Sequence, residues 1–255
     1  MKKLKGLFTK IIDSADTWLP ERLKRKFRRA NTYAKLVSAE DNKRRIINGQ
    51  HMAAGVRMID PATVYIDVDV EIEEGSVIYP SVILEGKCRI GKNTVLGPNT
   101  HLVNTIVGDE CRVRQSVAEN VQIGSSTTVG PFAYLRENAD IGDNCRIGNF
   151  VEIKNSILGS GVKMAHLAYM GDADVGADVN YSCGAITCNY DGKKKYRTTI
   201  EDGAFIGSNS NLLAPVTIGK NSYVAAGSTI TDDVDEDALA IARGRQVQKD
   251  GWIKK

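Results

Sequence analysis

The sequence predicts an all-β fold in which short strands wind into three-sided coils that stack as a parallel β-helix. Three regularities support this prediction. A large aliphatic residue returns at every sixth position over most of the chain, a small or compact residue commonly stands four places after it, and a glycine often follows it directly. A period of six fits neither a helix, with about 3.6 residues per turn, nor a two-sided strand, and it is typical of hexapeptide β-helix repeats.

Residues 1–52 differ in kind and predict a helical, basic segment. Residues 1–29 carry ten Lys and Arg against three acids, although the net charge of the whole chain is only +3. Apolar residues recur there at helical spacing until Pro20, which would end the helix. Such a helix would lie on an anionic membrane or pack on the protein or a partner subunit, and both interpretations stay open. We expect no nucleic-acid binding, because no aromatic-studded basic surface accompanies the charge.

Residues 53–235 hold the repeats. Each hexad should supply one strand and one corner, with the aliphatic and the small residue pointing inward and the glycine permitting the bend. Three hexads close a coil of about 18 residues, and about nine coils fit between residues 72 and 235. The aliphatic positions are Ile72, Ile78, Leu84, Ile90, Leu96, Leu102, Ile123, Val129, Leu135, Ile141, Ile147, Ile153, Ile200, Ile206, Leu212, Ile218, Val224 and Ile230. An antiparallel β-sandwich is disfavoured, because it has no reason to keep six-residue spacing.

Cysteine usage and hydropathy indicate the compartment. The five cysteines lack paired spacing, and Cys88, Cys111 and Cys145 fall at small inward positions. We therefore expect a reducing compartment, without a disulfide framework or a Cys-x-x-Cys metal site. No run of about 18 apolar residues and no apolar signal core is present, so we expect a cytoplasmic protein.

Two breaks in the repeat are candidates for function, because a β-helix is a scaffold. Residues 188–197 contain Asn, Asp, Gly and three lysines, which cannot fill an apolar prism and predict a protruding loop. His166 stands two places after an inward residue, so it should face outward at a strand or its corner. The other two histidines, His51 and His101, are not placed to complete a zinc site with it, and we expect no metal.

Several segments resemble a known family from about residue 31 onward. They are Arg44–Val56, Gly130–Arg136, Gly148–Asn155, Ala165–Asp172, Ile186–Gly192, Leu213–Val216 and Gln248–Trp252. The chain is similar to the acetyltransferase half of the bifunctional bacterial N-acetylglucosamine-1-phosphate uridyltransferase/glucosamine-1-phosphate N-acetyltransferase. The resemblance implies a left-handed β-helix, a homotrimer with active sites between subunits, and acetyl-CoA as co-substrate. It also implies that residues 236–255 form a tail completing the coenzyme A site.

The resemblance implies roles for individual residues. His166 matches the catalytic base, which takes a proton from the amine as its nitrogen attacks the thioester. The residues that match the family's contacts to the phosphate of the sugar substrate are Arg136, Lys154, Tyr169 and Lys195. Asn180 matches a sugar-binding residue. The residues that match positions near acetyl-CoA are Cys183, Asn189, Tyr190, Ser208, Ala226 and Arg243, with Cys183 in place of an alanine. The oxyanion donor is either Ser208 or a backbone amide near Asn189.

These residues predict acetyl-CoA-dependent N-acetylation of glucosamine 1-phosphate. No Gly-rich nucleotide loop occurs before the repeats, so we expect no uridyltransferase activity. Two alternatives stay open. One is an acetyltransferase for another amino-sugar phosphate or a nucleotide-linked amino sugar, and the other is a non-catalytic trimeric scaffold or regulator.

Overall fold

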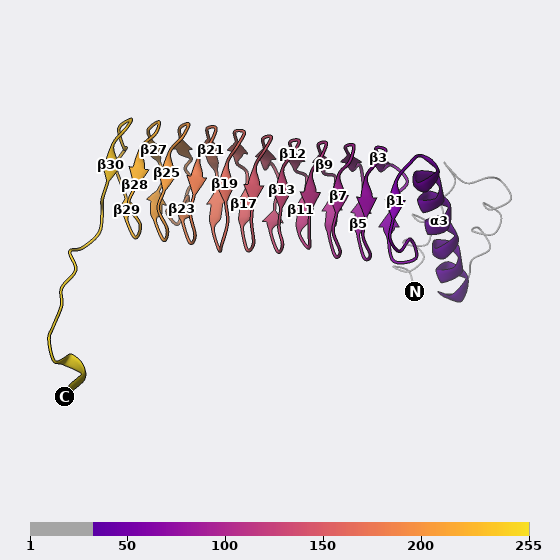
Figure 1. Cartoon of the computed structure of the whole chain (residues 1–255), viewed down its shortest axis with the longest axis horizontal. Coiled ribbons are helices and arrows are strands. Elements are labelled where there is room, and N and C mark those ends of the chain that lie inside the picture. Colours follow the sequence, from indigo (N-terminus) through magenta and orange to yellow (C-terminus); the bar gives the residue numbers. More distant parts are fainter. Residues whose placement is uncertain (1–32, 255) are drawn as a thin grey trace.

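The structure is a computed structural model that describes residues 33–254. One helix, α3 (Tyr33–Ala53), precedes a long stack of coils and lies at the amino-terminal end of the rod in Figure 1. The basic amphipathic helix expected within residues 1–29 lies outside the described residues. The boundaries expected between a helical segment, a β-helix and a tail stay predictions.

Three parallel sheets form the three faces of the rod, and the strands are short. Sheet A has eleven strands: β1 (Arg57–Met58), β4 (Val77–Ile78), β7 (Val95–Leu96), β10 (Arg112–Val113), β13 (Thr128–Val129), β16 (Arg146–Ile147), β19 (Lys163–Met164), β22 (Asn180–Tyr181), β25 (Phe205–Ile206), β28 (Tyr223–Val224) and β30 (Leu239–Ala240).

Sheet B has ten strands: β2 (Tyr65–Ile66), β5 (Ile83–Glu85), β8 (His101–Val103), β11 (Val117–Glu119), β14 (Tyr134–Leu135), β17 (Glu152–Lys154), β20 (Tyr169–Gly171), β23 (Ile186–Cys188), β26 (Asn211–Leu213) and β29 (Thr229–Ile230). Sheet C has nine: β3 (Glu71–Ile72), β6 (Arg89–Ile90), β9 (Ile106–Val107), β12 (Gln122–Ile123), β15 (Asp140–Ile141), β18 (Ile157–Leu158), β21 (Ala173–Val175), β24 (Thr198–Ile200) and β27 (Val216–Ile218).

Consecutive strands belong to different sheets, so the chain visits all three faces in each coil. This confirms the left-handed β-helix of hexapeptide repeats, with three hexads per coil. Coil length varies slightly. Fewer residues separate Leu102 from Ala118, its partner in the next coil, than separate Ile72 from its partner Ile90. The last strand, β30, lies within the segment expected to form the tail, and the chain then leaves the rod and ends in a short 3-10 helix, η1 (Trp252–Lys254) (Figure 1).

The interior is a continuous aliphatic column. Every aliphatic position of the six-residue period is buried, as the sequence predicts. The small residues four places later are buried as well: Ser76, Val82, Cys88, Thr94, Thr100, Ala133, Ala139, Cys145, Val151, Ala204, Ser210, Val216, Ser222 and Ser228. Burial raises the pKa of the Cys88, Cys111 and Cys145 thiols. These three cysteines therefore behave as small core residues.

Most glycines that directly follow an aliphatic position have a different role from the one expected; Gly130, with φ of 88°, is an exception. Gly91 and Gly142 do not adopt positive φ, so they do not form the bends. A Cβ on Gly91 would lie 2.5 Å from the carbonyl carbon of Gly108 in the next coil. The bends occur further along each hexad, for example at Asn93, with φ of 54°. Glycine is needed because the coils approach too closely for a side chain.

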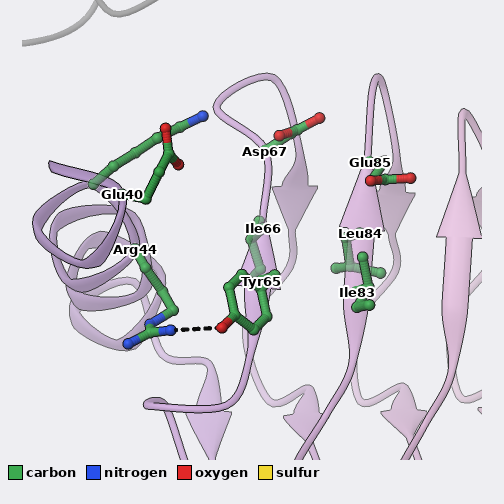
Figure 2. A pocket seen from close by; sticks show the side chains of 9 residues that line it. Glu40, Arg44, Tyr65, Ile66, Asp67, Ile83, Leu84 and Glu85 are labelled. Carbon is green, nitrogen blue, oxygen red and sulfur yellow. Dashed lines mark hydrogen bonds between the residues drawn. The ribbon is translucent and has the colours of Figure 1, made fainter. Parts of the chain in front are cut away.

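Helix α3 packs against the first coil and ends at Ala53, and Gly55, two residues later, has a φ of +93°. Positive φ at this position is typical of a helix C-terminus. Asn48, which is buried, donates hydrogen bonds to the carbonyl oxygens of Pro61 (2.9 Å) and Val64 (3.0 Å). Arg44 donates to the Tyr65 hydroxyl at 3.0 Å, as Figure 2 shows. The helix thus supplies polar partners to the first turn of the β-helix. Within residues 33–254, no helix has both the length and the apolarity needed to cross a bilayer.

Candidate functional site

His166 lies at the corner between β19 of sheet A and β20 of sheet B, and its side chain is exposed, as the sequence predicts. Its φ is +64°, so the chain turns sharply at this residue. The backbone is held from both sides, because the His166 amide donates to Asn149 O and the His166 carbonyl accepts from the Gly184 amide, both at 3.1 Å. The adjacent coils therefore fix the corner from which the imidazole projects.

Strand register brings three predicted cofactor residues into line with His166. In sheet A, Met164 pairs with Tyr181 and the ladder continues through β25 and β28. Just beyond each of these strands, the same corner carries His166, Cys183, Ser208 and Ala226, one in each coil; we call these four residues the corner column. Since coils are about 4.8 Å apart, the column spans about 14 Å.

Arg243, from the segment expected to form the tail (residues 236–255), contacts the corner column at Ala226. The Arg243 guanidinium donates to the Ala226 carbonyl oxygen at 2.8 Å. Asn209 and Gly227, which each follow a member of the column, donate to the carbonyls of Cys183 and Ser208, both at 2.8 Å. Residues far apart in the sequence are thus brought to one edge of the rod.

A pocket of about 330 Å³ opens beside the corner column. Its lining residues are Arg146, Lys163, Met164, Ala165, His166, Asn180, Tyr181, Ser182, Cys183 and Ser208. Asn180 donates to the Ser182 hydroxyl at 2.9 Å. Tyr181 fills the coil interior and donates to the Tyr169 carbonyl at 3.1 Å, and burial raises its phenol pKa well above the usual value. The pocket therefore joins four sequence-predicted residues, namely His166, Asn180, Cys183 and Ser208.

The residues expected on the phosphate side lie on a different face. Arg136 and Lys154 follow the aligned residues Leu135 and Ile153 of β14 and β17, and neither lines the pocket. Both are ion-paired within the chain: Arg136 Nη1 lies 2.7 Å from Glu152 Oε1, and Lys154 Nζ lies 3.3 Å from Glu137 Oε1.

These pairs shift the titration of their members. The hydrogen bond that Arg136 donates to the Glu152 carboxylate raises the pKa of Arg136. The backbone amide of Glu137 itself, followed by the Lys154 ammonium, lowers the pKa of the Glu137 carboxyl. The cluster thus holds two cations and two carboxylates, and it is close to neutral in this single chain.

Asp172 is a buried carboxylate that sequence reasoning did not select. It is 6% exposed and accepts hydrogen bonds from the side-chain amides of Asn155 and Asn189. Asn189, a predicted cofactor residue, is itself buried. The Tyr169 hydroxyl lies in the same neighbourhood, since a Cβ on Gly171 would lie 2.3 Å from it and 2.8 Å from Asn189 Nδ2. Asp172 therefore fixes the position of Asn189.

The predicted loop does protrude. The coil that contains it is enlarged, because the step from Val175 to its register partner Ile200 is much longer than the step from Ile72 to Ile90. Asp191 accepts hydrogen bonds from the backbone amides of Lys193 (2.7 Å) and Lys194 (2.6 Å), and these amides lower its pKa. Tyr190 and Lys195 face each other in an isolated antiparallel bridge, and both side chains are exposed.

The far end of the loop is anchored by Arg197. Its guanidinium binds the Asp174 carboxylate, with Nε to Oδ2 at 2.8 Å, and the Ala173 carbonyl at 3.0 Å. The loop is thus tied to the rod at both ends, by Asn189 and by Arg197.

Arg146 and Lys163 line the His166 pocket, and sequence reasoning missed them. Each occupies the first position of a sheet A strand and precedes a buried apolar residue, Ile147 or Met164. Alternation along the hexads could have placed both on the outer face, but only the strand register places them beside His166.

The other histidines and a second pocket lie elsewhere. His51 is in the last turn of α3, and His101 contacts Glu85 at 2.9 Å. Residues 33–254 contain no cluster of His, Cys, Asp and Glu suited to a metal ion. A smaller pocket of about 150 Å³, between α3 and the first coils (Figure 2), mixes acidic and basic side chains and contains none of the predicted site residues.

Comparison with known proteins identifies relatives that match most of the chain. The bacterial transferase hexapeptide (six repeats) family matches residues 69–104, 120–155 and 197–232. The bifunctional protein GlmU from Geobacillus sp. (strain WCH70) is 52% identical over 223 residues, which are 88% of this chain and 49% of that protein. GlmU from Clostridioides difficile (strain 630) is 49% identical over 225 residues, again 88% of this chain and 49% of that protein. The chain therefore spans about half the length of the curated relatives it matches.

A solved structure also resembles the chain. The structure of a UDP-N-acetylglucosamine acyltransferase from Francisella novicida superposes with a TM-score of 0.49 at 16% sequence identity. The match covers 71% of this chain and 65% of that one.

Proposed function

We propose that this chain, whose repeats match the bacterial transferase hexapeptide family and whose sequence is similar to about half of GlmU, is an acyltransferase. Its reaction is the transfer of the acetyl group of acetyl-CoA to the amine of glucosamine 1-phosphate. The observation that carries this proposal is the corner column, in which a histidine is followed, coil by coil, by Cys183, Ser208 and Ala226. An elongated co-substrate would fit this line, with its thioester beside the histidine.

The chemistry assigns His166 the role of base. An amino sugar in water is largely an ammonium ion, whereas attack on a thioester needs a neutral amine. His166 accepts the proton as the new C–N bond forms. The tetrahedral intermediate then collapses, the C–S bond breaks, and the proton passes to the coenzyme A thiolate. Ser208 or a backbone amide near Asn189 donates a hydrogen bond to the developing oxyanion.

The substrate phosphate is assigned to Arg136, Lys154, Tyr169 and Lys195, and the sugar to Asn180. Arg136 and Lys154 do not line the pocket of their own chain, which supports a site completed by a second copy. An exposed apolar row on the corner next to His166 supports the same assembly: Phe132 and Phe150 stack with ring centroids 5.4 Å apart, and Leu167 is 68% exposed. Exposed apolar patches are typical of interaction sites. We therefore propose a homotrimer.

A thiol-release assay with acetyl-CoA and glucosamine 1-phosphate tests the proposal. The variant is His166→Asn, because asparagine tolerates positive φ and already occupies nine corner positions within residues 33–254, including Asn93 and Asn209. Loss of a general base lowers the rate by about 10²- to 10⁴-fold. Equal rates for the two proteins would reject His166 as the base. Absence of thiol release from the unmodified chain would favour a non-catalytic scaffold or regulator. Faster turnover of a nucleotide-linked amino sugar than of glucosamine 1-phosphate would favour an acetyltransferase for that substrate.

The assembly has its own test. Sedimentation equilibrium should give three times the mass of one chain. A monomer that turns over at the normal rate would reject the shared site.

The expectations about uridyltransferase activity and residues 1–29 also stay predictions. Incubation with UTP and N-acetylglucosamine 1-phosphate should yield no nucleotide sugar. Liposome co-sedimentation with and without residues 1–29 distinguishes membrane binding from packing on protein.

A further inference from the structure

The pocket beside His166 carries two cations that have no role in the proposed reaction so far. Arg146 and Lys163 are register partners in sheet A, so their Cα atoms lie on neighbouring strands about 4.8 Å apart. Both side chains are exposed and point outward from the rod, since the next residue in each strand fills the core. None of the ten residues that line this pocket is acidic.

The pair Arg136 and Lys154 has carboxylate partners within the chain, whereas the pair Arg146 and Lys163 has none among the described residues. Arg136 and Lys154 are neutralised by Glu152 and Glu137. Arg146 and Lys163, in contrast, make no ion pair or side-chain hydrogen bond with any residue between 33 and 254. Two adjacent positive charges repel each other, and an anion placed between them removes that repulsion and accepts several hydrogen bonds.

The position of Arg146 and Lys163 along the rod indicates which of the two substrates they bind. The corner column runs from His166 towards the carboxyl-terminal coils, through Cys183 and Ser208. Lys163 lies in the coil of His166 and Arg146 one coil earlier, in the opposite direction. An acetyl-CoA molecule that follows the column extends away from Arg146. The cations therefore face the end of the pocket that the amino sugar occupies.

We propose that Arg146 and Lys163 form an anion subsite that binds the phosphoryl group of the sugar phosphate in the protomer that carries His166. This inference rests on the proposed function for the identity of the ligand. It adds a second cationic contact to the one assigned to Arg136 and Lys154. The two cations are binding residues and leave the proton transfer to His166.

Isothermal titration calorimetry on the full chain tests the subsite with four probes: glucosamine 1-phosphate, glucosamine, coenzyme A and 3′-dephospho-coenzyme A. The variants Arg146→Gln and Lys163→Gln each remove one charge with little change in length. We expect the Kd for glucosamine 1-phosphate to rise about tenfold in each and about a hundredfold in the double variant. Binding of the other three probes should change less than twofold.

Two further variants serve as controls. Arg112→Gln removes a cation from the same column of sheet A, two coils from Arg146 and outside the pocket, and should bind like the unmodified chain. The exchange Arg146→Lys with Lys163→Arg keeps both charges and should keep most of the affinity. Thiol release is measured on the same samples, and a chain that binds glucosamine 1-phosphate through these cations without releasing thiol would retain the subsite and reject acetyl transfer.

Three results would overturn the proposal. The first is unchanged affinity for glucosamine 1-phosphate in the double variant. The second is a selective loss of coenzyme A binding, which would assign the cations to the co-substrate. The third is dissociation of the assembly in sedimentation experiments, which would assign Arg146 and Lys163 to a contact between subunits.

Discussion

Replacement of Asp172 by asparagine isolates the contribution of one buried carboxylate to the loop. Asp172 lies at the base of the protruding loop, where it accepts hydrogen bonds from Asn155 and Asn189. The substitution keeps side-chain volume, and asparagine tolerates the φ of 52° at this position. It changes one acceptor oxygen into an amino group, which then faces another amino group. One of the two hydrogen bonds must therefore be lost.

The magnitude follows from the type of bond. A hydrogen bond to a charged group contributes about 1.5–3 kcal/mol, so the loss of one should cost the loop base about 2 kcal/mol. Since about 1.4 kcal/mol corresponds to a tenfold change, the locally open state should become about 30-fold more populated. Two amides report this opening, because Tyr196 donates to Asn189 O at 2.9 Å and Thr198 donates to Asp172 O at 3.0 Å.

Hydrogen exchange resolved to single amides measures the effect. The Tyr196 and Thr198 amides should exchange about 30-fold faster in Asp172→Asn, whereas the Gly124 amide, bonded to Ile141 O in a distant coil, should not change. The matched variant Asp174→Asn removes an exposed ion pair to Arg197, which is worth at most about 1 kcal/mol, and should accelerate exchange less than about fivefold. Equal exchange in Asp172→Asn and the unmodified chain would refute the reasoning.

Three further predictions concern packing and thiol chemistry. Gly142→Ala should lower the free energy of unfolding by about 1–3 kcal/mol at fixed protein concentration, because the new Cβ would lie 2.8 Å from the Ser160 amide nitrogen; an unchanged denaturation midpoint would contradict the close-approach explanation. Gly49→Ala, in helix α3, where the new Cβ would have no described atom within 4 Å apart from the neighbouring backbone of its own helix, should instead stabilise by about 0.5–1 kcal/mol. At pH 8, iodoacetamide should modify the exposed Cys183 far faster than Cys145, whose pKa is raised by burial, and acetyl-CoA should protect Cys183; mass spectrometry of the peptides tests both statements.

The predicted position of Asn189 near acetyl-CoA links Asp172 to co-substrate binding. Since Asp172 holds the Asn189 side chain, its asparagine variant should also raise the KM for acetyl-CoA. The rate constant at saturation should change less, because His166 is untouched. A lower rate constant with an unchanged KM would instead favour the backbone amide near Asn189 as the oxyanion donor over a role in binding acetyl-CoA.

The sequence alone determined the cross-section of the rod. A large aliphatic residue every six positions can be buried only if the chain turns after each hexad, so the period specifies which side chains point inward. It also located the protruding loop, because lysines and an Asp-Gly pair cannot enter an apolar interior. The exposed position of His166 followed from the same alternation.

Only the tertiary structure decided which outward residues meet. The coils differ in length, so residues at the same place in successive hexads are not always neighbours in space. Which residues lie side by side in adjacent coils follows from strand register and not from sequence spacing. Register aligned His166 with Cys183 and placed Arg146 and Lys163 beside them. Register also placed Glu152 beside Arg136 and Glu137 beside Lys154.

The roles of glycine and of Asp172 were likewise decided in three dimensions. Local sequence suggests that glycine forms a bend, whereas the separation of neighbouring backbones explains why Gly91 cannot carry a side chain. Asp172 reads as an ordinary polar residue until Asn155 and Asn189 converge on it from the preceding and following coils. Contacts across coils are set by the stacking of backbones, and a one-dimensional period records only which way each residue faces.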